Sequence, residues 1–111
     1  MDKLILYRHL VKNILTEYSQ YQPALNDLEI QAIFDEHSEH YQVVTFGWEG
    51  NKYVHYCLIH IDLKADKIWI QWNMTEKDLA EELVTKDVLK EDIVIGFHPP
   101  SMLQLTGYAV G

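Results

Sequence analysis

The spacing of hydrophobic residues changes along the chain from a helical period to a strand period. Near the N-terminus hydrophobic residues recur every three or four positions, which predicts an amphipathic helix over residues 2–20. Its apolar face contains Leu4, Tyr7, Val11, Ile14, Leu15 and Tyr18. Asp2 can cap the first turn, and Gln22-Pro23 is expected to end the helix, because the residue before a proline avoids the α conformation.

Four later segments alternate hydrophobic and polar residues, as strands half buried in a sheet do. They cover residues 28–35, 40–48, 53–63 and 67–73. Polar turns lie between them, and Gly50 and Asn51 supply residues that tolerate the positive φ of a tight hairpin turn. Each strand should therefore pair antiparallel with the one before it.

The C-terminal third predicts a short helix and a short strand. Thr75 is expected to cap a helix over residues 76–85, and residues 93–97 form an apolar run that Pro99-Pro100 ends. The tail, residues 102–110, either pairs at a sheet edge or docks elsewhere. The sequence thus predicts an α+β fold with a mainly antiparallel β-sheet. The N-terminal amphipathic helix and the second short helix should pack on one face.

Length and composition indicate one globular domain spanning residues 1–111, because 48% of the residues are hydrophobic and 23% are charged. Cys57 is the single cysteine and lies in an apolar strand segment, so we expect a core thiol and a reducing, cytoplasmic location. The hydrophobic runs are shorter than the roughly 20 residues that a membrane-spanning helix needs. We therefore expect no membrane association.

Net charge argues against direct binding of nucleic acid by this chain alone. Seventeen acidic residues against nine basic ones give a net charge of −8, whereas nucleic-acid binders present a basic surface to phosphate. Residues 26–39 carry acidic residues with no lysine or arginine, and residues 76–92 are also rich in acids. These stretches are either solvated faces that maintain solubility or a docking surface for a basic partner.

Candidate chemistry is sparse. His60 and Asp62 share one strand face, and His40, His55 and His98 could converge with them on a metal ion. No recognised metal, nucleotide or nucleophile motif supports this arrangement, so we predict no metal, no cofactor and no catalytic residues. The alternative that remains open is a small metal-dependent or hydrolytic enzyme that uses His60, Asp62 and His98.

Aromatic residues on the predicted strands favour a protein interface over a nucleic-acid stacking platform, because no cationic groove accompanies them. They are Trp48, Tyr53, Tyr56, Trp69 and Trp72. Strict alternation places Trp69 on the face opposite Ile68, Ile70 and Trp72. One sheet face is then core, and the other exposes some aromatic side chains.

A set of short segments, in order and at matching spacing, carries a resemblance to a known family. They are Phe34-Asp35, His40-Tyr41-Gln42, Gly47-Trp48, Val54-His55, Ile59-His60-Ile61-Asp62, Lys67-Ile68-Trp69-Ile70-Gln71, Glu82-Leu83 and Asp92-Ile93-Val94-Ile95-Gly96-Phe97-His98-Pro99-Pro100. With these segments the chain resembles the XisI family, the controlling factors for excision of the fdxN element. It departs from the family at Asn51-Lys52-Tyr53, where relatives often carry arginine, and at residues 101–105, where relatives carry a basic, aromatic segment.

The resemblance implies a non-enzymatic accessory factor that acts with an XisH-like partner in a programmed cyanobacterial DNA rearrangement, through protein–protein interaction. A separate recombinase would perform the strand exchange. The apolar tail also favours docking on protein, including a second copy of this chain. The candidate interaction residues are Trp48, His55, His60, Asp62, Trp69, Gln71 and His98.

Overall fold

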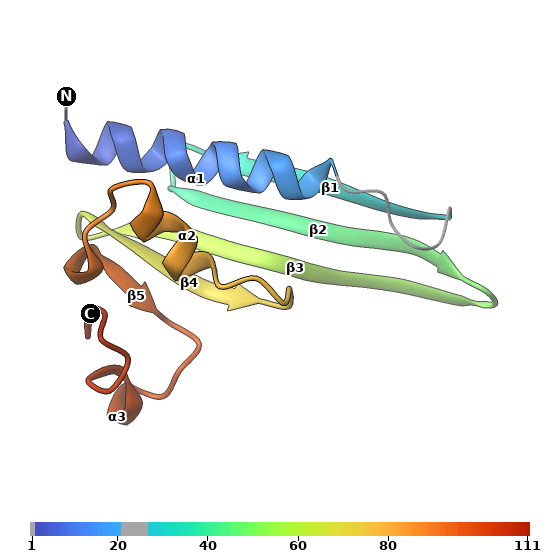
Figure 1. Cartoon of the computed structure of the whole chain (residues 1–111). Helices are drawn as coiled ribbons and strands as arrows, with labels where there is room; N and C mark the ends of the chain where they lie inside the picture. The colour runs from blue at the N-terminus through green and yellow to red at the C-terminus, as the bar shows by residue number, and fades with distance from the viewer. Residues whose placement is uncertain (1, 21–26) are drawn as a thin grey trace.

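A five-stranded sheet carries helices on one face in the computed structural model, which describes residues 2–20 and 27–111 (Figure 1). The elements in chain order are α1 (Lys3–Ser19), β1 (Leu28–Asp35), β2 (His40–Glu49), β3 (Lys52–Lys64), β4 (Lys67–Asn73), α2 (Leu79–Thr85), the 3₁₀ turn η1 (Lys90–Asp92), β5 (Ile93–Ile95) and α3 (Pro100–Leu103). The predicted α+β class, with a mainly antiparallel sheet, is confirmed.

Helix α1 forms where the hydrophobic period predicts it. The Asp2 carboxylate accepts a hydrogen bond from the Leu4 N–H at 3.0 Å and so caps the first turn. The predicted end at Gln22-Pro23 lies outside the described residues. No described helix has the length and apolar character that crossing a membrane requires.

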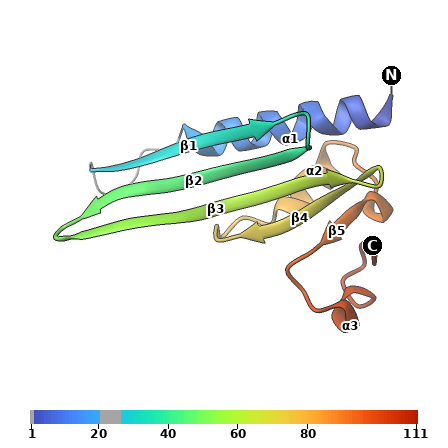
Figure 2. The same cartoon turned by 180° about the vertical axis from the view of Figure 1, so that it is seen from behind.

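The strands follow each other in the order β1-β2-β3-β4-β5, and Figure 2 shows the sheet from behind. The first four strands pair antiparallel through short turns, as predicted. Strand β5 is different because it pairs parallel with β4. The sheet is therefore mainly antiparallel, as predicted, with one parallel pair at this last strand. Helix α2 and the turn η1 supply the long crossover that parallel neighbours need.

Helix α2 begins three residues later than expected. Asp78, not Thr75, is its N-cap, and the Asp78 carboxylate accepts a hydrogen bond from the Glu81 N–H at 3.1 Å. The Asn73 side-chain oxygen accepts bonds from both the backbone N–H and the hydroxyl of Thr75, at 2.8 and 2.6 Å. These bonds fold residues 73–77 into a turn, because Asn side chains compete with helical hydrogen bonding.

Two irregularities shift the pairing register of β3. The β2–β3 ladder changes register between Val43 and Val44, so that Leu58 is an extra residue on β3. The β3–β4 ladder shifts beside His60, and there Gln71 is the extra residue on β4. Trp72 consequently pairs with His60 and is 47% exposed. Its predicted place on the same face as Ile68 and Ile70 is wrong, because the shift interrupts strict alternation.

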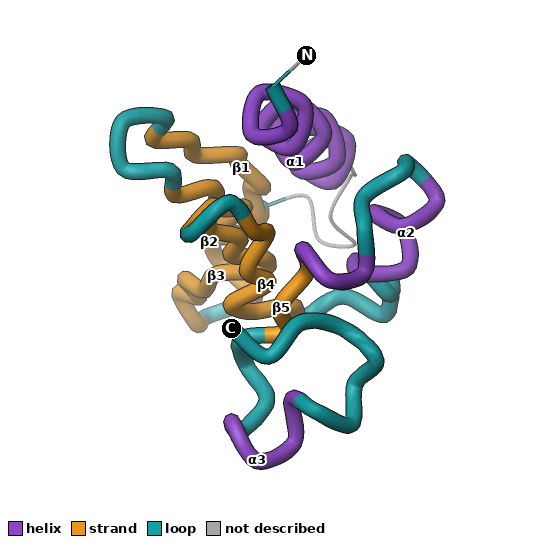
Figure 3. The backbone as a smooth tube through the Cα atoms, turned by 90° about the vertical axis from the view of Figure 1, so that its left-hand side faces the viewer, coloured by secondary structure: helices purple, strands orange, loops and turns teal. Residues whose placement is uncertain are grey.

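The core lies between the sheet and the two helices α1 and α2. Viewed along the sheet in Figure 3, both helices lie on the same side, as predicted. The apolar faces of α1 and α2 meet every second residue of the strands. The largest fully buried side chains are Tyr7, Tyr41, Ile14, Leu15, Ile59, Ile61, Ile68, Leu79, Leu83 and Ile93. The opposite face of the sheet carries no described helix over β1, β2 and β3.

The outer side of β5 is paired, whereas part of β3 is not. The tail pairs beside β5, where the Ala109 N–H donates to the Ile93 carbonyl at 2.8 Å, as one of the two predicted possibilities has it. Strand β3 is longer than β4, and pairing between them begins at Ile59. Within the described chain, residues 52–57 of β3 thus have no strand on that side.

Gly47 and Gly50 offer a matched test of how the β2–β3 hairpin is built. A Cβ on Gly47, whose φ is +136°, would lie 2.2 Å from the Asp27 backbone oxygen. We predict that Gly47→Ala lowers the free energy of unfolding by roughly 2–4 kcal/mol, because backbone strain and overpacking add.

Gly50 is the control for Gly47, since its φ is +63° and an added Cβ would meet nothing within 4 Å. Gly50→Ala should cost about 1 kcal/mol from the left-handed conformation alone. Urea unfolding followed by circular dichroism measures both variants. If Gly47→Ala and Gly50→Ala lost the same amount of stability, the close approach of Gly47 to the Asp27 backbone would be contradicted.

Candidate functional site

Four polar side chains meet on the face of the sheet that α1 and α2 do not cover. The Nδ1 atom of His40 and the Nε2 atom of His60 each lie 2.7 Å from the same oxygen, Oδ1 of Asp62. The Gln71 amide donates to the other oxygen, Oδ2, at 3.2 Å. We call His40, His60, Asp62 and Gln71 the histidine–aspartate cluster.

Sheet geometry explains why these residues meet. His40 and Asp62 are direct cross-strand partners between β2 and β3, and His60 lies two residues before Asp62 on the same face. Gln71 joins from β4 at the register shift beside His60. The extra residue at each shift therefore aligns the cluster, as strand bulges do when they redirect side chains.

The cluster is electrostatically coupled. Burial alone would raise the pKa of Asp62, but the hydrogen bonds from His40 and His60 outweigh it, so the pKa lies below its ordinary value of 3.8. The hydrogen bond with Asp62 raises the pKa of His40 above 6.5. Asp62 is thus held as a carboxylate, and it favours the protonated form of His40.

Trp69 lies next to the cluster, because it is the cross-strand partner of Asp62. The Lys64 ammonium sits 4.2 Å from the centre of its ring, a cation–π contact. Its indole nitrogen is buried and has no hydrogen-bond partner among the described residues. Trp69 therefore contributes an apolar wall on one side of Asp62.

Other predicted interaction residues lie apart from the cluster. Trp48 packs edge to face on Tyr53 near the hairpin tip, with ring centres 5.2 Å apart, and both side chains are about half exposed. His55 follows on the same face and lies beside Phe46. These residues form a separate aromatic end of the sheet.

His98 does not reach the cluster. It follows β5, stacks near Phe97 with ring centres 4.9 Å apart, and lines a pocket of about 240 Å³ on the helix side with Ile70 and Ala80. The alternative of an enzyme site made by His60, Asp62 and His98 is therefore not supported, because His40 and not His98 lies with His60 and Asp62. The sequence suggested His40 only as one of several histidines that could converge.

Cys57 is a partly buried thiol on the uncovered face. Its Sγ donates to the Ile59 carbonyl at 3.2 Å. Burial raises the pKa of this thiol, so the protonated form is favoured. The prediction of a core thiol is therefore wrong in position, because Cys57 is only partly buried and lies on the face opposite the core.

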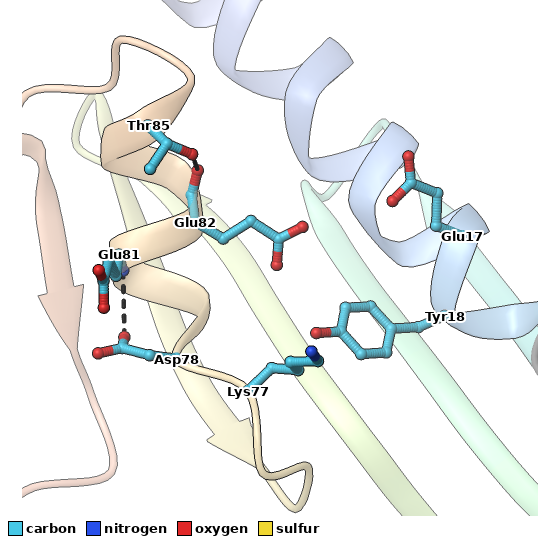
Figure 4. Close-up of a pocket in the computed structure, with 7 residues that line it drawn as sticks. All are labelled: Glu17, Tyr18, Lys77, Asp78, Glu81, Glu82 and Thr85. Carbon is cyan, nitrogen blue, oxygen red and sulfur yellow. Dashed lines mark hydrogen bonds between the residues drawn. The ribbon is translucent and has the colours of Figure 1, made fainter.

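A second feature is an acidic groove of about 390 Å³ between α1 and α2 (Figure 4). Figure 4 shows the Tyr18 ring of α1 and the Glu82 carboxylate of α2 pointing toward each other's helix. The lining residues are Glu17, Tyr18, Lys77, Asp78, Glu81, Glu82 and Thr85. Four carboxylates against one ammonium make the groove strongly negative.

Within the described part of the chain, two acidic residues of the stretch 26–39 form ion pairs, unlike those of the groove. Arg8 of α1 forms an ion pair with Glu39, which also accepts a hydrogen bond from the Tyr41 hydroxyl. Lys12 pairs with Glu36 at 2.5 Å. These contacts hold α1 against the β1–β2 turn, so part of this acidity is neutralised within the molecule.

Comparison with known proteins supplies the family. The chain matches the XisI protein family over residues 1–110. The chain belongs to the XisI family. The crystal structure of a XisI-like protein from Anabaena variabilis is 42% identical, covers 97% of this chain and 99% of its own, and has a TM-score of 0.92.

A second XisI-family structure, the fdxN element excision controlling factor XisI from Anabaena variabilis, is 32% identical. It covers 99% of this chain and 100% of its own, with a TM-score of 0.87. A search among curated proteins finds no match. The family resemblance inferred from short sequence segments is therefore confirmed.

The XisI-like segments of the sequence contain the histidine–aspartate cluster. His40 begins one of them, and His60 and Asp62 stand together in another. Gln71 ends the segment that forms β4. The part of the sequence that carries the family resemblance and the part that carries the polar cluster therefore coincide on the uncovered sheet face.

We predict that Asp62→Asn lowers the pKa of His40 toward its ordinary value, because the carboxylate that favours the imidazolium is lost. An NMR titration of the His40 ring protons measures this change. Asp66→Asn removes the same charge from an exposed turn residue, whose φ of +62° an asparagine tolerates, and should leave the His40 titration unchanged.

The pH dependence of stability follows from the same pair. The pKa of His40 is raised, so its contribution is complete below 6.5 and is lost as the pH rises through the folded-state value. The pKa of Asp62 is lowered, so its contribution is complete above 3.8 and is lost as the pH falls further. The free energy of unfolding of wild type should exceed that of Asp62→Asn most between pH 3.8 and 6.5, and the difference should shrink at lower and at higher pH. Urea unfolding at several pH values measures it, and the same difference at pH 9 as at pH 6 would contradict the coupling.

Proposed function

We propose that this protein is a non-enzymatic accessory factor that controls the excision of a DNA element. The observation that carries the proposal is the end-to-end match to the fdxN element excision controlling factor XisI, at 32% identity over nearly all of both chains. The factor acts in the cytoplasm, where its single cysteine stays reduced. The recombination chemistry belongs to another protein.

Control through protein contact is the mode of action that the surface favours. The net charge of −8 opposes contact with phosphate backbones. The groove between α1 and α2 concentrates carboxylates, and among the described residues no ion pair neutralises Glu17, Glu81 or Glu82. Such a groove accepts a lysine- or arginine-rich segment, and charge complementarity speeds the encounter. The partner we propose is an XisH-like protein.

The aromatic end of the sheet is a second contact surface for the same role. Trp48 and Tyr53 are exposed side by side, and aromatic residues of this kind are enriched among interface hot spots. The unpaired edge of β3 starts beside them. An XisH-like partner that spans both surfaces would gain binding free energy from electrostatic contacts in the acidic groove and from apolar contacts at the aromatic end.

A binding experiment with the purified XisH-like protein of the same genome tests the proposal. We expect a stoichiometric complex by size exclusion and calorimetry, and no shift of a labelled DNA duplex by this chain alone at low salt. No complex at micromolar concentrations, or a salt-sensitive shift of duplex by this chain alone, would overturn the proposed mode of action.

Charge variants separate the two surfaces. The double variant Glu81→Gln/Glu82→Gln should weaken the complex about tenfold at low salt and less at high salt, because screening reduces the electrostatic component. Glu29→Gln/Asp66→Asn removes the same charge from exposed positions outside both surfaces and serves as the control. Equal weakening by both pairs would mean that only net charge matters.

Truncation of the aromatic pair examines the apolar component. Trp48→Ala should weaken the complex by about 2 kcal/mol at any salt concentration, as hot-spot truncations do. Ile5→Ala, which truncates the 51% exposed Ile5 on α1, is the apolar control and should leave binding unchanged. Surface plasmon resonance at two salt concentrations distinguishes this loss from the electrostatic one.

A further inference from the structure

Three potential metal ligands converge in the histidine–aspartate cluster. The Nδ1 atom of His40, the Nε2 atom of His60 and a carboxylate oxygen of Asp62 all lie within 4.8 Å of one another. In a tetrahedral zinc site, with bonds of about 2.0–2.2 Å, neighbouring ligand atoms are separated by roughly 3.3 Å. The three side chains thus need only small movements to surround an ion.

The hydrogen bonds now present show that the donors already point to a common centre. Both imidazole nitrogens are directed at the same oxygen of Asp62, each at 2.7 Å. A dication placed between these atoms would replace the two shared protons. A neutral imidazole would carry its single proton on the other ring nitrogen after this exchange, and a protonated imidazole would release the shared proton and keep the other.

The surroundings of Asp62 are those of a supported ligand. Gln71 holds its second oxygen at 3.2 Å, in the way that outer-sphere groups orient metal-binding carboxylates. The Asp62 side chain is only 13% exposed, whereas that of His40 is 53% exposed. The site is therefore fixed at its base and open to solvent above, where water or a partner's side chain can complete the coordination.

The ligand types select the class of ion. Two imidazoles and one carboxylate suit Zn²⁺, Co²⁺ or Ni²⁺, whereas Mg²⁺ and Ca²⁺ prefer sites built from oxygen ligands. We propose that His40, His60 and Asp62 bind one divalent transition-metal ion of the Zn²⁺ class on the uncovered sheet face. The three protein ligands leave a fourth position free.

Metal titration of the untagged full-length protein, stripped with EDTA, tests the site. Zn²⁺ in calorimetry should bind with one equivalent per chain, and Co²⁺ should produce the visible absorption of a four-coordinate site that Zn²⁺ then abolishes. Mg²⁺ should show no saturable binding. Failure of Zn²⁺ to bind saturably to the folded wild-type protein would overturn the proposal.

Variants locate the ion. His40→Gln changes a half-exposed side chain, so the fold should persist, and Zn²⁺ affinity should fall by about 100-fold or more. Gln71→Leu should weaken binding about tenfold through loss of the support to Asp62. Circular dichroism of each metal-free variant verifies folding.

Two histidines outside the cluster and the thiol provide the controls. His55→Gln and His98→Gln remove imidazoles that lie away from the cluster, and Cys57→Ala removes the thiol of the same sheet face. All three should bind Zn²⁺ as the wild type does. Retained affinity in His40→Gln and in His60→Gln, or a loss in any control, would place the ion elsewhere and refute the proposed site.

Discussion

The packing of α1 across one face of the sheet is the constraint on which the rest of the structure depends. Val11, Ile14 and Leu15 are fully or almost fully buried, and they cover the inward residues of the strands. Burial of apolar area at about 25 cal/mol per Å² makes this contact the main source of stability. Every second strand residue is committed to it. The opposite residues are therefore free to carry imidazoles, carboxylates and indoles.

Sequence periodicity predicts the elements well, because each hydrophobic pattern reflects burial on a single side. The helix over residues 2–20 and the first four strands are found within a few residues of their predicted bounds. The start of α2 is harder to predict, since Thr75 and Asp78 are both good caps. Only the side-chain bonds of Asn73, which close a turn first, decide between them.

The cluster could not be predicted in full, because it depends on one residue of register. The β2–β3 hairpin pairs Glu49 with Lys52. A regular ladder continued from this pair would place His40 opposite Ile61, and His40 would then lie on the core face, away from Asp62. The extra residue at Leu58 moves the pairing by one. No local signal in Cys57-Leu58-Ile59 marks that insertion, since all three residues are good strand formers.

The unpaired edge of β3 affects how strongly copies of the protein associate with one another. Free backbone donors and acceptors along residues 52–57 invite strand addition between molecules. The shared net charge of −8 opposes it, because every approaching copy is repelled. The same negative charge therefore has two effects. It keeps identical copies apart, which prevents self-association, and it leaves the β3 edge accessible to a basic protein.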